Sequence, residues 1–430
     1  MNIYGILIAI LIIGLIDTAF SRIPSLTKLK WRLKAKYRIT KGTTFLILIM
    51  LCCMGTAVYT WYREQHATRP QVAESVIPVA PEIEEFSYDS EPELPDYDFS
   101  NCYIYSQLEG VDKDLYEIYY DLVMHQDQIG YKRIYQLGNP DLFDYDRMSV
   151  AYYALIYDHP EFFYLEMDEI SRLDIMTATN IAGTYLDIRI TPCSSEEKAM
   201  IKRFDTAVDT FMSDIDLNAA PYEIELQIHD KLINLVTYDY PVLNINGRNL
   251  AHTAYGALVD DGMGNANAAV CDGYAKAYQY LLCRAGICST VVSGVAGSNS
   301  GDYAGEGDHA WNIVKLDDEW YEVDCCWDDC ELSGTGLSAE DISYIESLEP
   351  QYFAATHYFF NRTTEEMAYL PDTEEYTFII PRQNGYTTLN CCHSAYHTRE
   401  QDPSMEGYEL FKTIDDMLPI ASGTEYGLGL

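Results

Sequence analysis

The stretch from Thr43 to Tyr62 contains twenty residues without a charged side chain and ends in aromatic residues. An α-helix of this length rises about 30 Å, which matches the hydrocarbon core of a bilayer. An earlier apolar run begins at Ile3 and reaches spanning length if Asp17 lies at the depth of the lipid headgroups. We therefore predict a membrane anchor of two helices, at about 3–20 and 43–62.

The segment between the two apolar runs sets the expected orientation. From Arg22 to Lys41 the sequence carries eight basic residues and no acidic one. Basic loops stay in the cytoplasm, so we expect loop 21–42 there, near anionic lipid, and everything after Tyr62 outside the cell. A cleaved signal peptide is the alternative. The run from Ile3, however, has no basic residue before it and no small-residue cleavage site after it.

Charge is unevenly distributed along the chain. The whole sequence has 28 Lys and Arg against 67 Asp and Glu, a net charge of −39. From Arg63 onward the balance is 20 basic against 66 acidic residues. Because binding to phosphates needs a basic surface, this balance argues against nucleic acid as a partner. Hydrophobic residues make up 48% of the chain and aromatic residues 13%, which excludes a disordered acidic tail and predicts a folded core.

Composition and periodicity divide the rest of the chain. Residues 63–100 are rich in Pro and in acidic residues, which predicts an extended linker. Residues 101–215 mix helical and strand-like spacing, so we expect a small α+β domain. Residues 216–400 form the next predicted domain, and the pattern of 401–430 says little beyond a C-terminal tail. In this first domain we expect helices at 112–125, 146–159 and 196–212 and a strand at 183–192.

Cys271 occupies a position that favours a reactive thiol. A loop rich in Gly, Asn and Ala precedes it, and apolar residues recur at helical spacing from Tyr274 until Gly286, which suits a C-terminal cap. Cys271 is therefore expected at a helix N-terminus, where unpaired amides and the helix dipole stabilise a thiolate. The alternative is a buried cysteine that acts only as a small hydrophobic side chain.

Residues 308–324 predict a β-hairpin with a tight turn at Asp317–Asp318. A two-residue turn pairs Trp311 with Asp324 and makes His309 a diagonal cross-strand neighbour of Asp324. A turn of odd length would instead place the two on opposite faces. In the first register the carboxylate orients an imidazole that can deprotonate a thiol. An Asp within a hydrophobic strand is otherwise costly without a partner.

These motifs resemble a known family. Cys271-Asp-Gly-Tyr-Ala, His309-Ala-Trp-Asn and the strand Trp320–Asp324 are similar to the bacterial transglutaminase-like proteins of the papain-like cysteine-enzyme superfamily, which include membrane-anchored members. The resemblance covers residues 225–370 well and 101–215 loosely. It implies an α+β fold in which a helix bearing the cysteine packs on an antiparallel sheet bearing the His and the Asp.

The resemblance also implies roles for single residues. By it, Cys271 is the nucleophile, His309 the general base and acid, and Asp324 the residue that orients His309. From the residues themselves, we expect Trp311 to shield the site, with core packing as the alternative, and Tyr255 is a weak candidate for an oxyanion donor. The chain departs from the family's usual small, hydroxylated or proline residues at Cys325, Cys326 and Cys330.

Groups of potential metal ligands also occur. His393 and His397 are one helical turn apart beside two cysteines, but no CxxC pair accompanies them, so we do not predict zinc. Acid pairs such as Asp328–Asp329 lack the ligand spacing of an EF-hand, and we expect them in solvated turns rather than at calcium. We therefore predict no metal and no cofactor. The candidate disulfide partners are Cys325, Cys326, Cys330, Cys391 and Cys392.

The sequence thus predicts cysteine-dependent acyl-enzyme chemistry on peptide or protein amides outside the cell. Hydrolysis, as in a protease or amidase, is slightly favoured over transfer to an amine, as in a transglutaminase, because both share the acyl-enzyme and water is abundant. The alternative of a different class is a membrane-anchored binding or scaffold protein that keeps the fold without catalysis.

Overall fold

The computed structural model describes residues 94–166, 172–244, 249–262, 267–298, 305–330, 337–368, 376–383, 385–391, 395–399 and 408–427. The chain divides into two units, 1–88 and 89–430, and all the described residues belong to the second. The predicted membrane spans, the basic loop and residues 63–93 of the predicted linker lie outside the described residues. Among the residues described, no helix has both the length and the apolar character needed to cross a bilayer.

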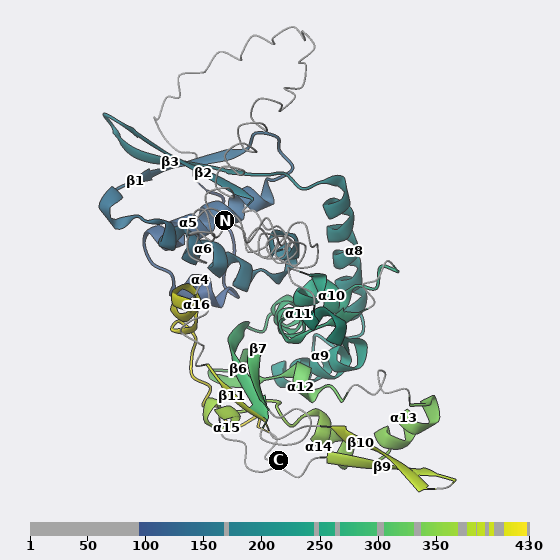
Figure 1. Ribbon diagram of the computed structural model, residues 1–430. Helices are drawn as coiled ribbons and strands as arrows, with labels where there is room; N and C mark the ends of the chain where they lie inside the picture. Colours follow the sequence, from purple (N-terminus) through teal and green to yellow (C-terminus); the bar gives the residue numbers. More distant parts are fainter. Residues whose placement is uncertain are drawn as a thin grey trace, which may run out of the picture. The chain divides into compact units, whose positions relative to one another are not determined.

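The N-terminal part of the second unit contains a three-stranded antiparallel sheet with the order β1–β3–β2, packed against helix α5 (Figure 1). The predicted helices at 112–125, 146–159 and 196–212 and the strand at 183–192 are confirmed to within two residues at each end. A capping box between Ser194 and Glu197 starts the last of these helices. The elements are α4 (Tyr103–Gln107), α5 (Val111–Met124), β1 (Lys132–Leu137), η1 (Pro140–Leu142), α6 (Tyr145–Asp158), η2 (Pro160–Phe162), α7 (Phe163–Glu166), β2 (Leu173–Asn180), β3 (Gly183–Ile190) and α8 (Ser195–Met212).

A four-stranded antiparallel sheet with the order β11–β6–β7–β8 follows in the chain. Helix α11 packs on β6 and β7, where Ala275 of the helix meets Val291 and Ala310 of the strands in a small buried cluster. This arrangement of a helix on an antiparallel sheet agrees with the expected core. Its elements are α9 (Pro221–Leu235), β4 (Thr237–Tyr238), η3 (Tyr240–Asn244), η4 (Leu250–His252), α10 (Ala254–Leu258), β5 (Ala268–Ala269), α11 (Cys271–Arg284), β6 (Ser289–Ser298), β7 (Gly305–Leu316), β8 (Glu319–Val323) and β11 (Ala395–Thr398).

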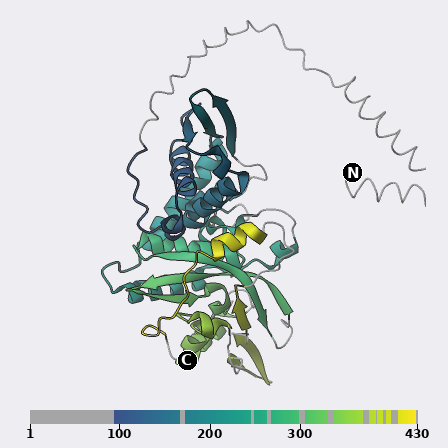
Figure 2. The ribbon, with the colours of Figure 1, turned by 90° about the vertical axis from the view of Figure 1, so that its left-hand side faces the viewer.

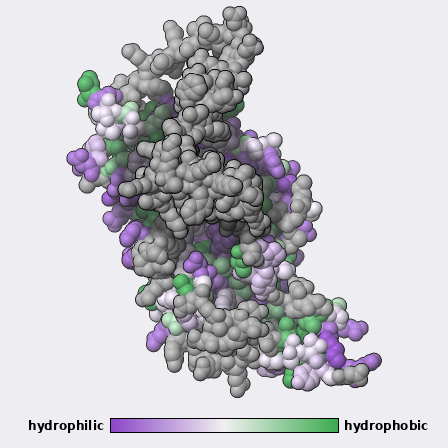
Figure 3. Space-filling model, in the orientation of Figure 1, coloured by the Kyte–Doolittle hydropathy of each residue, from purple (hydrophilic) through white to green (hydrophobic). Residues whose placement is uncertain are grey.

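The remaining elements surround this sheet. Helix α16 lies beside α6 and β6 (Figures 1 and 2), and β9 and β10 form a separate antiparallel hairpin. On the face drawn in Figure 3, hydrophilic residues predominate among the coloured atoms and hydrophobic ones occur in small groups. These elements are α12 (Cys325–Asp328), α13 (Ala339–Glu346), α14 (Gln351–Thr356), α15 (Thr364–Ala368), β9 (Tyr376–Arg382), β10 (Gly385–Cys391) and α16 (Tyr408–Asp415).

One buried cluster runs through both predicted domains, from Ile104 to Ala421. Aromatic side chains join the two parts: the ring of Phe163 lies 4.7 Å from that of Tyr255. The C-terminal segment also packs on the β7–β8 hairpin, because the hydroxyl of Tyr426 donates to Asp317 at 2.6 Å. No gap in the core therefore separates 101–215 from 216–400.

Candidate active site

Cys271 is the first residue of α11, as the sequence predicts. Val270 is the N-cap residue, and its side chain makes no capping hydrogen bond to the first amides of α11. The start of the helix is fixed closely against the preceding segment, because the N–H of Val270 donates to the carbonyl of Ala251 at 3.0 Å. Cys271 is a partly exposed free thiol, which is the placement a nucleophile requires.

His309 and Asp324 meet through the register of the hairpin. Strands β7 and β8 are joined by a two-residue turn and pair Asn312 with Val323, which confirms the predicted register. Nε2 of His309 lies 2.7 Å from Oδ2 of Asp324 and donates to it. Since Nε2 is taken by the carboxylate, Nδ1 is the ring nitrogen left for Cys271, which lies near enough to His309 to raise the pKa of the imidazole. The structure thus brings together the three predicted catalytic residues.

The electrostatics of this group favour a charged imidazole. Burial alone lowers the pKa of His309, but the charges of Asp324 and Cys271 and its hydrogen bonds to both outweigh burial and raise that pKa to about 10. Burial acts in the opposite sense on Asp324, yet His309 and His397 together hold the pKa of this carboxyl well below its usual range. At neutral pH the pair is therefore an imidazolium and a carboxylate.

His397 is a site residue that the sequence prediction missed. It lies on β11 rather than on a helical turn, is fully buried, and donates from Nε2 to the same Oδ2 of Asp324 at 2.7 Å. Burial lowers the pKa of His397, so it donates as a neutral ring. The other oxygen of Asp324 accepts the backbone N–H groups of Cys326 and Trp327 at 3.0 and 3.1 Å. His393, which the sequence places four residues before His397, lies outside the described residues.

Trp311 lies directly beside the His–Asp pair. Its ring is nearly parallel to that of His309, with centroids 6.1 Å apart, and its Nε1 donates to Glu322 at 2.8 Å. The side chain is buried, so it both packs in the core and covers one side of the site. Tyr255 is placed elsewhere, since its hydroxyl accepts from Arg203 and lies 3.2 Å from Asp261.

Two predictions about residues after Asp324 are wrong. Asp328 is fully buried rather than solvated: one carboxylate oxygen lies 3.2 Å from Nε2 of His229, and the other accepts the N–H of Phe359 at 2.8 Å. Cys325 is a buried free thiol and not a disulfide partner. Both side chains belong to α12, the short helix that Asp324 caps, and both are buried.

A cavity of about 480 Å³ lies next to the site. Its wall includes Asp272 and Ala310, the residues that directly follow Cys271 and His309. Lys276 enters the wall from α11 and is held by Glu166 at 2.6 Å and by the carbonyl of His252 at 2.8 Å. The cavity therefore combines apolar walls with one cluster of paired charges.

Comparisons with known proteins match the same part of the chain. Residues 210–325 match the core of the transglutaminase-like superfamily. Kyphoscoliosis peptidase of Mus musculus is 31% identical over 134 residues, which cover 30% of this chain and 18% of that protein. Kyphoscoliosis peptidase of Homo sapiens is 34% identical over 91 residues, which cover 20% of this chain and 13% of that protein. A crystal structure of a TGase aligns at 15% identity with a TM-score of 0.22, covering 35% of this chain and 43% of that chain.

The chain spans less than a fifth of the length of these curated relatives. The matched range contains the helix start at Cys271, the hairpin with His309, and Asp324, which directly follows β8. The stretch 210–325 is thus a transglutaminase-like domain, and Cys271, His309 and Asp324 lie within it.

Proposed function

We propose that the protein is a cysteine-dependent enzyme that cleaves peptide or protein amides through an acyl-enzyme. One observation carries this proposal: Cys271 begins a helix and lies near enough to His309 to raise its pKa, while Nε2 of the same imidazole is 2.7 Å from Asp324. A nucleophile, a base and an orienting group in this order make up the arrangement that covalent acyl transfer requires. The match to the transglutaminase-like superfamily supports it.

In the proposed reaction, Sγ of Cys271 attacks the amide carbonyl carbon, and the backbone N–H of Cys271 faces the developing oxyanion. The C–N bond then breaks while Nδ1 of His309 gives its proton to the leaving amine, which leaves a thioester. Neutral His309 next takes a proton from water, whose oxygen attacks the thioester and releases the carboxylic acid. This step restores the thiolate of Cys271 and the imidazolium of His309. The side chain of Asp324 stays ionised throughout.

Hydrolysis is favoured over amine transfer, because water outcompetes an amine unless a site is built to hold one. The name of the relatives, kyphoscoliosis peptidase, agrees with this preference. The test offers casein and a fluorescent primary amine to the full-length protein. We expect new amino termini and no incorporated amine, and we expect Cys271→Ser to abolish the product. Incorporation of the fluorescent amine without new amino termini would show that the enzyme is a transglutaminase and not a hydrolase.

A non-catalytic scaffold with the same fold makes a different prediction for the thiol. In the enzyme, iodoacetamide alkylates Cys271 faster than a model thiol near neutral pH, and His309→Gln removes the acceleration. Peptide mapping by mass spectrometry assigns the label to Cys271, with the buried Cys325 as an internal unreactive control. A rate for Cys271 equal to that of the model thiol would favour the scaffold.

We further propose that the catalytic domain lies outside the cell, anchored by the N-terminal spans. The eight basic residues between Arg22 and Lys41 support this orientation. The test adds a membrane-impermeant protease to intact cells that express the chain with a C-terminal epitope tag. We expect loss of the tag in intact cells, while a cytoplasmic marker protein survives. Protection of the tag until the cells are lysed would show that the C-terminal part lies in the cytoplasm.

A further inference from the structure

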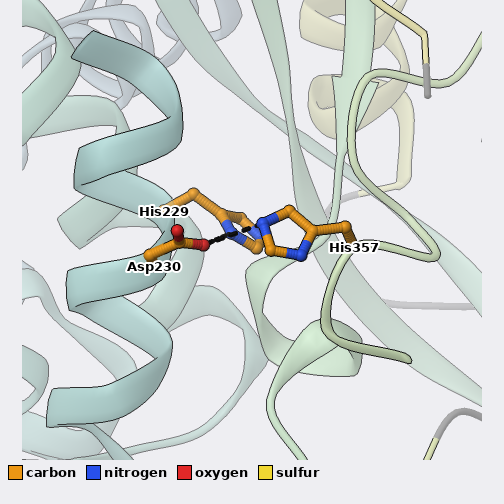
Figure 4. A group of neighbouring side chains, drawn as sticks. All are labelled: His229, Asp230 and His357. Carbon is orange, nitrogen blue, oxygen red and sulfur yellow. Dashed lines mark hydrogen bonds and ion pairs between the residues drawn. The ribbon is translucent and has the colours of Figure 1, made fainter. Parts of the chain in front are cut away.

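A second group of two histidines and one aspartate lies apart from the catalytic residues. His229 and Asp230 belong to α9, and His357 directly follows α14; their side chains converge in Figure 4. Oδ1 of Asp230 lies 3.3 Å from Nδ1 of His229 and 2.8 Å from Nε2 of His357. The three ligand atoms all lie within 4.8 Å of one another. The proposed reaction uses none of these side chains.

The far nitrogen of each ring already has an acceptor. Nδ1 of His357 lies 2.9 Å from the carbonyl oxygen of Phe353, which can only accept, so this nitrogen carries the hydrogen. Nε2 of His229 lies 3.2 Å from a carboxylate oxygen of the buried Asp328 and donates to it. A histidine that binds a metal usually donates its other N–H to a carbonyl or a carboxylate in this way.

The near nitrogens both face one carboxylate oxygen, and Nδ1 of His229 lies within hydrogen-bond distance of it, at 3.3 Å. Among the described residues, Nε2 of His357 has no partner with hydrogen-bond geometry, although Oδ1 of Asp230 is 2.8 Å away. Two acceptors at this distance repel unless a proton or a cation lies between them. Both rings are buried, with centroids 4.9 Å apart, so the two nitrogens and the carboxylate oxygen point into one small space. A single divalent cation there would bond to all three atoms.

We propose that Nδ1 of His229, Oδ1 of Asp230 and Nε2 of His357 bind one divalent transition-metal ion, with zinc as the best fit. Two imidazoles and a carboxylate suit zinc, and tetrahedral ligands at 2.0–2.2 Å from zinc lie about 3.4 Å apart. The 3.3 Å separation between Nδ1 of His229 and Oδ1 of Asp230 agrees with this spacing. The 2.8 Å separation between Nε2 of His357 and the same oxygen is shorter, and a rotation of the half-exposed carboxylate of Asp230 would lengthen it. A water molecule would complete the coordination, because Asp230 is partly exposed. This proposal departs from the absence of metal that the sequence predicts.

The ion would connect three elements near the active site. His229 and Asp230 hold α9, His357 holds the end of α14, and Asp328 links the site to α12. Phe359 then connects α12 to the catalytic aspartate, because its carbonyl accepts the N–H of Asp324 at 3.2 Å. The ion would thus brace these elements, and the site stands independently of which reaction the domain catalyses.

Cobalt titration of the full-length, metal-free protein tests the proposal, because Co²⁺ reports its own ligands. We expect one equivalent to bind with the visible spectrum of a tetrahedral nitrogen and oxygen site and without a thiolate charge-transfer band. X-ray absorption of the zinc-loaded wild type gives the ligand set independently of any variant. Sulfur ligands, or the absence of stoichiometric binding, would overturn the proposal.

Matched variants locate the ion. We expect His357→Gln to lose at least about tenfold in affinity and to lose the rise in Tm that zinc gives the wild type. His125→Gln, a half-exposed histidine of the N-terminal part, should bind as the wild type does. His397→Gln distinguishes the catalytic His–Asp–His group, which offers similar ligands. Unchanged affinity in His357→Gln, or loss of binding only in His397→Gln, would contradict the assignment.

Discussion

At the residue scale, Asp324 is the most heavily bonded group of the candidate site. Its carboxylate accepts from His309, from His397 and from two backbone N–H groups of α12. Four donors repay the cost of burying a carboxylate within an apolar sheet edge. The same residue is both the cap of α12 and the partner of His309, so the position of the imidazole depends on backbone geometry as well as on charge.

Asp324→Asn should shift the alkaline limit of activity downward. The charge of Asp324 raises the pKa of His309 against burial, to about 10, and the imidazolium exists only below that pKa. Removing the charge lowers the pKa, so activity fails at a lower pH, and kcat falls by about 10²-fold or more. The pH profile of casein turnover is the measurement. The control is Asp318→Asn, because Asp318 is an exposed turn residue of the same hairpin. An unchanged alkaline limb of the pH profile in Asp324→Asn would contradict the role of Asp324 in raising the pKa of His309.

His397→Leu tests the second histidine as a positioning residue. Losing one donor raises the pKa of Asp324, so the acid limb of kcat moves to higher pH and kcat falls about tenfold with KM unchanged. His397→Gln retains a donor and should recover most of the loss. A purely structural role would lower Tm without moving the acid limb, and equal activity of the Leu and Gln variants would exclude positioning.

The sequence predicted Cys271, His309 and Asp324 because local rules determine their places. A helix start positions the first, and a two-residue turn sets the register of the other two. His397 was missed since its contact with Asp324 spans 73 residues and depends on β11 pairing with β6. No local pattern reports such a pairing. The buried position of Asp328 was missed for the same reason, because its partner His229 lies on α9.

At the scale of elements, the close packing of α11 depends on Gly273. A Cβ there would lie 2.3 Å from the carbonyl oxygen of Ala251 and 2.8 Å from the Cβ of Ala269. Neither atom can rotate away, so Gly273→Ala must push the helix start and Cys271 outward. The clash, about 1–3 kcal/mol, outweighs the helix propensity gained, about 1 kcal/mol.

We therefore expect Gly273→Ala to lower both the free energy of unfolding and the alkylation rate of Cys271. Urea unfolding and iodoacetamide labelling measure the two effects. Gly138→Ala is the matched control, since a Cβ there meets nothing within 4 Å. A variant with wild-type stability and labelling would show that α11 does not need this close contact.

Elements with strong periodicity were predictable, and elements defined by their neighbours were not. Helices α5, α6 and α8 follow from apolar spacing alone. Strand β11 has four residues, too few for a pattern, and exists because β6 offers it an edge. The continuous core across residue 215 is likewise a property of packing, through contacts such as that between Phe163 and Tyr255.

At the scale of the whole molecule, the net charge of −39 combines two opposite regimes. The basic loop accounts for eight cations, and the chain from Arg63 onward carries 20 basic against 66 acidic residues. Within the cavity beside the site, however, Lys276 pairs with Glu166. We therefore expect the acidic excess to act on substrates mainly as a long-range field.

Such a field predicts that cationic substrates react faster and that salt removes the advantage. Two peptides with the same scissile bond, one flanked by Lys and one by Gln, are compared by kcat/KM at rising ionic strength. We expect the Lys peptide to lead at low salt and the ratio to approach one as the Debye length falls from about 10 Å at 0.1 M to about 3 Å at 1 M. The Gln peptide alone should change little. A ratio that persists at high salt would instead locate the preference in direct contacts with acidic side chains, against the field as its cause.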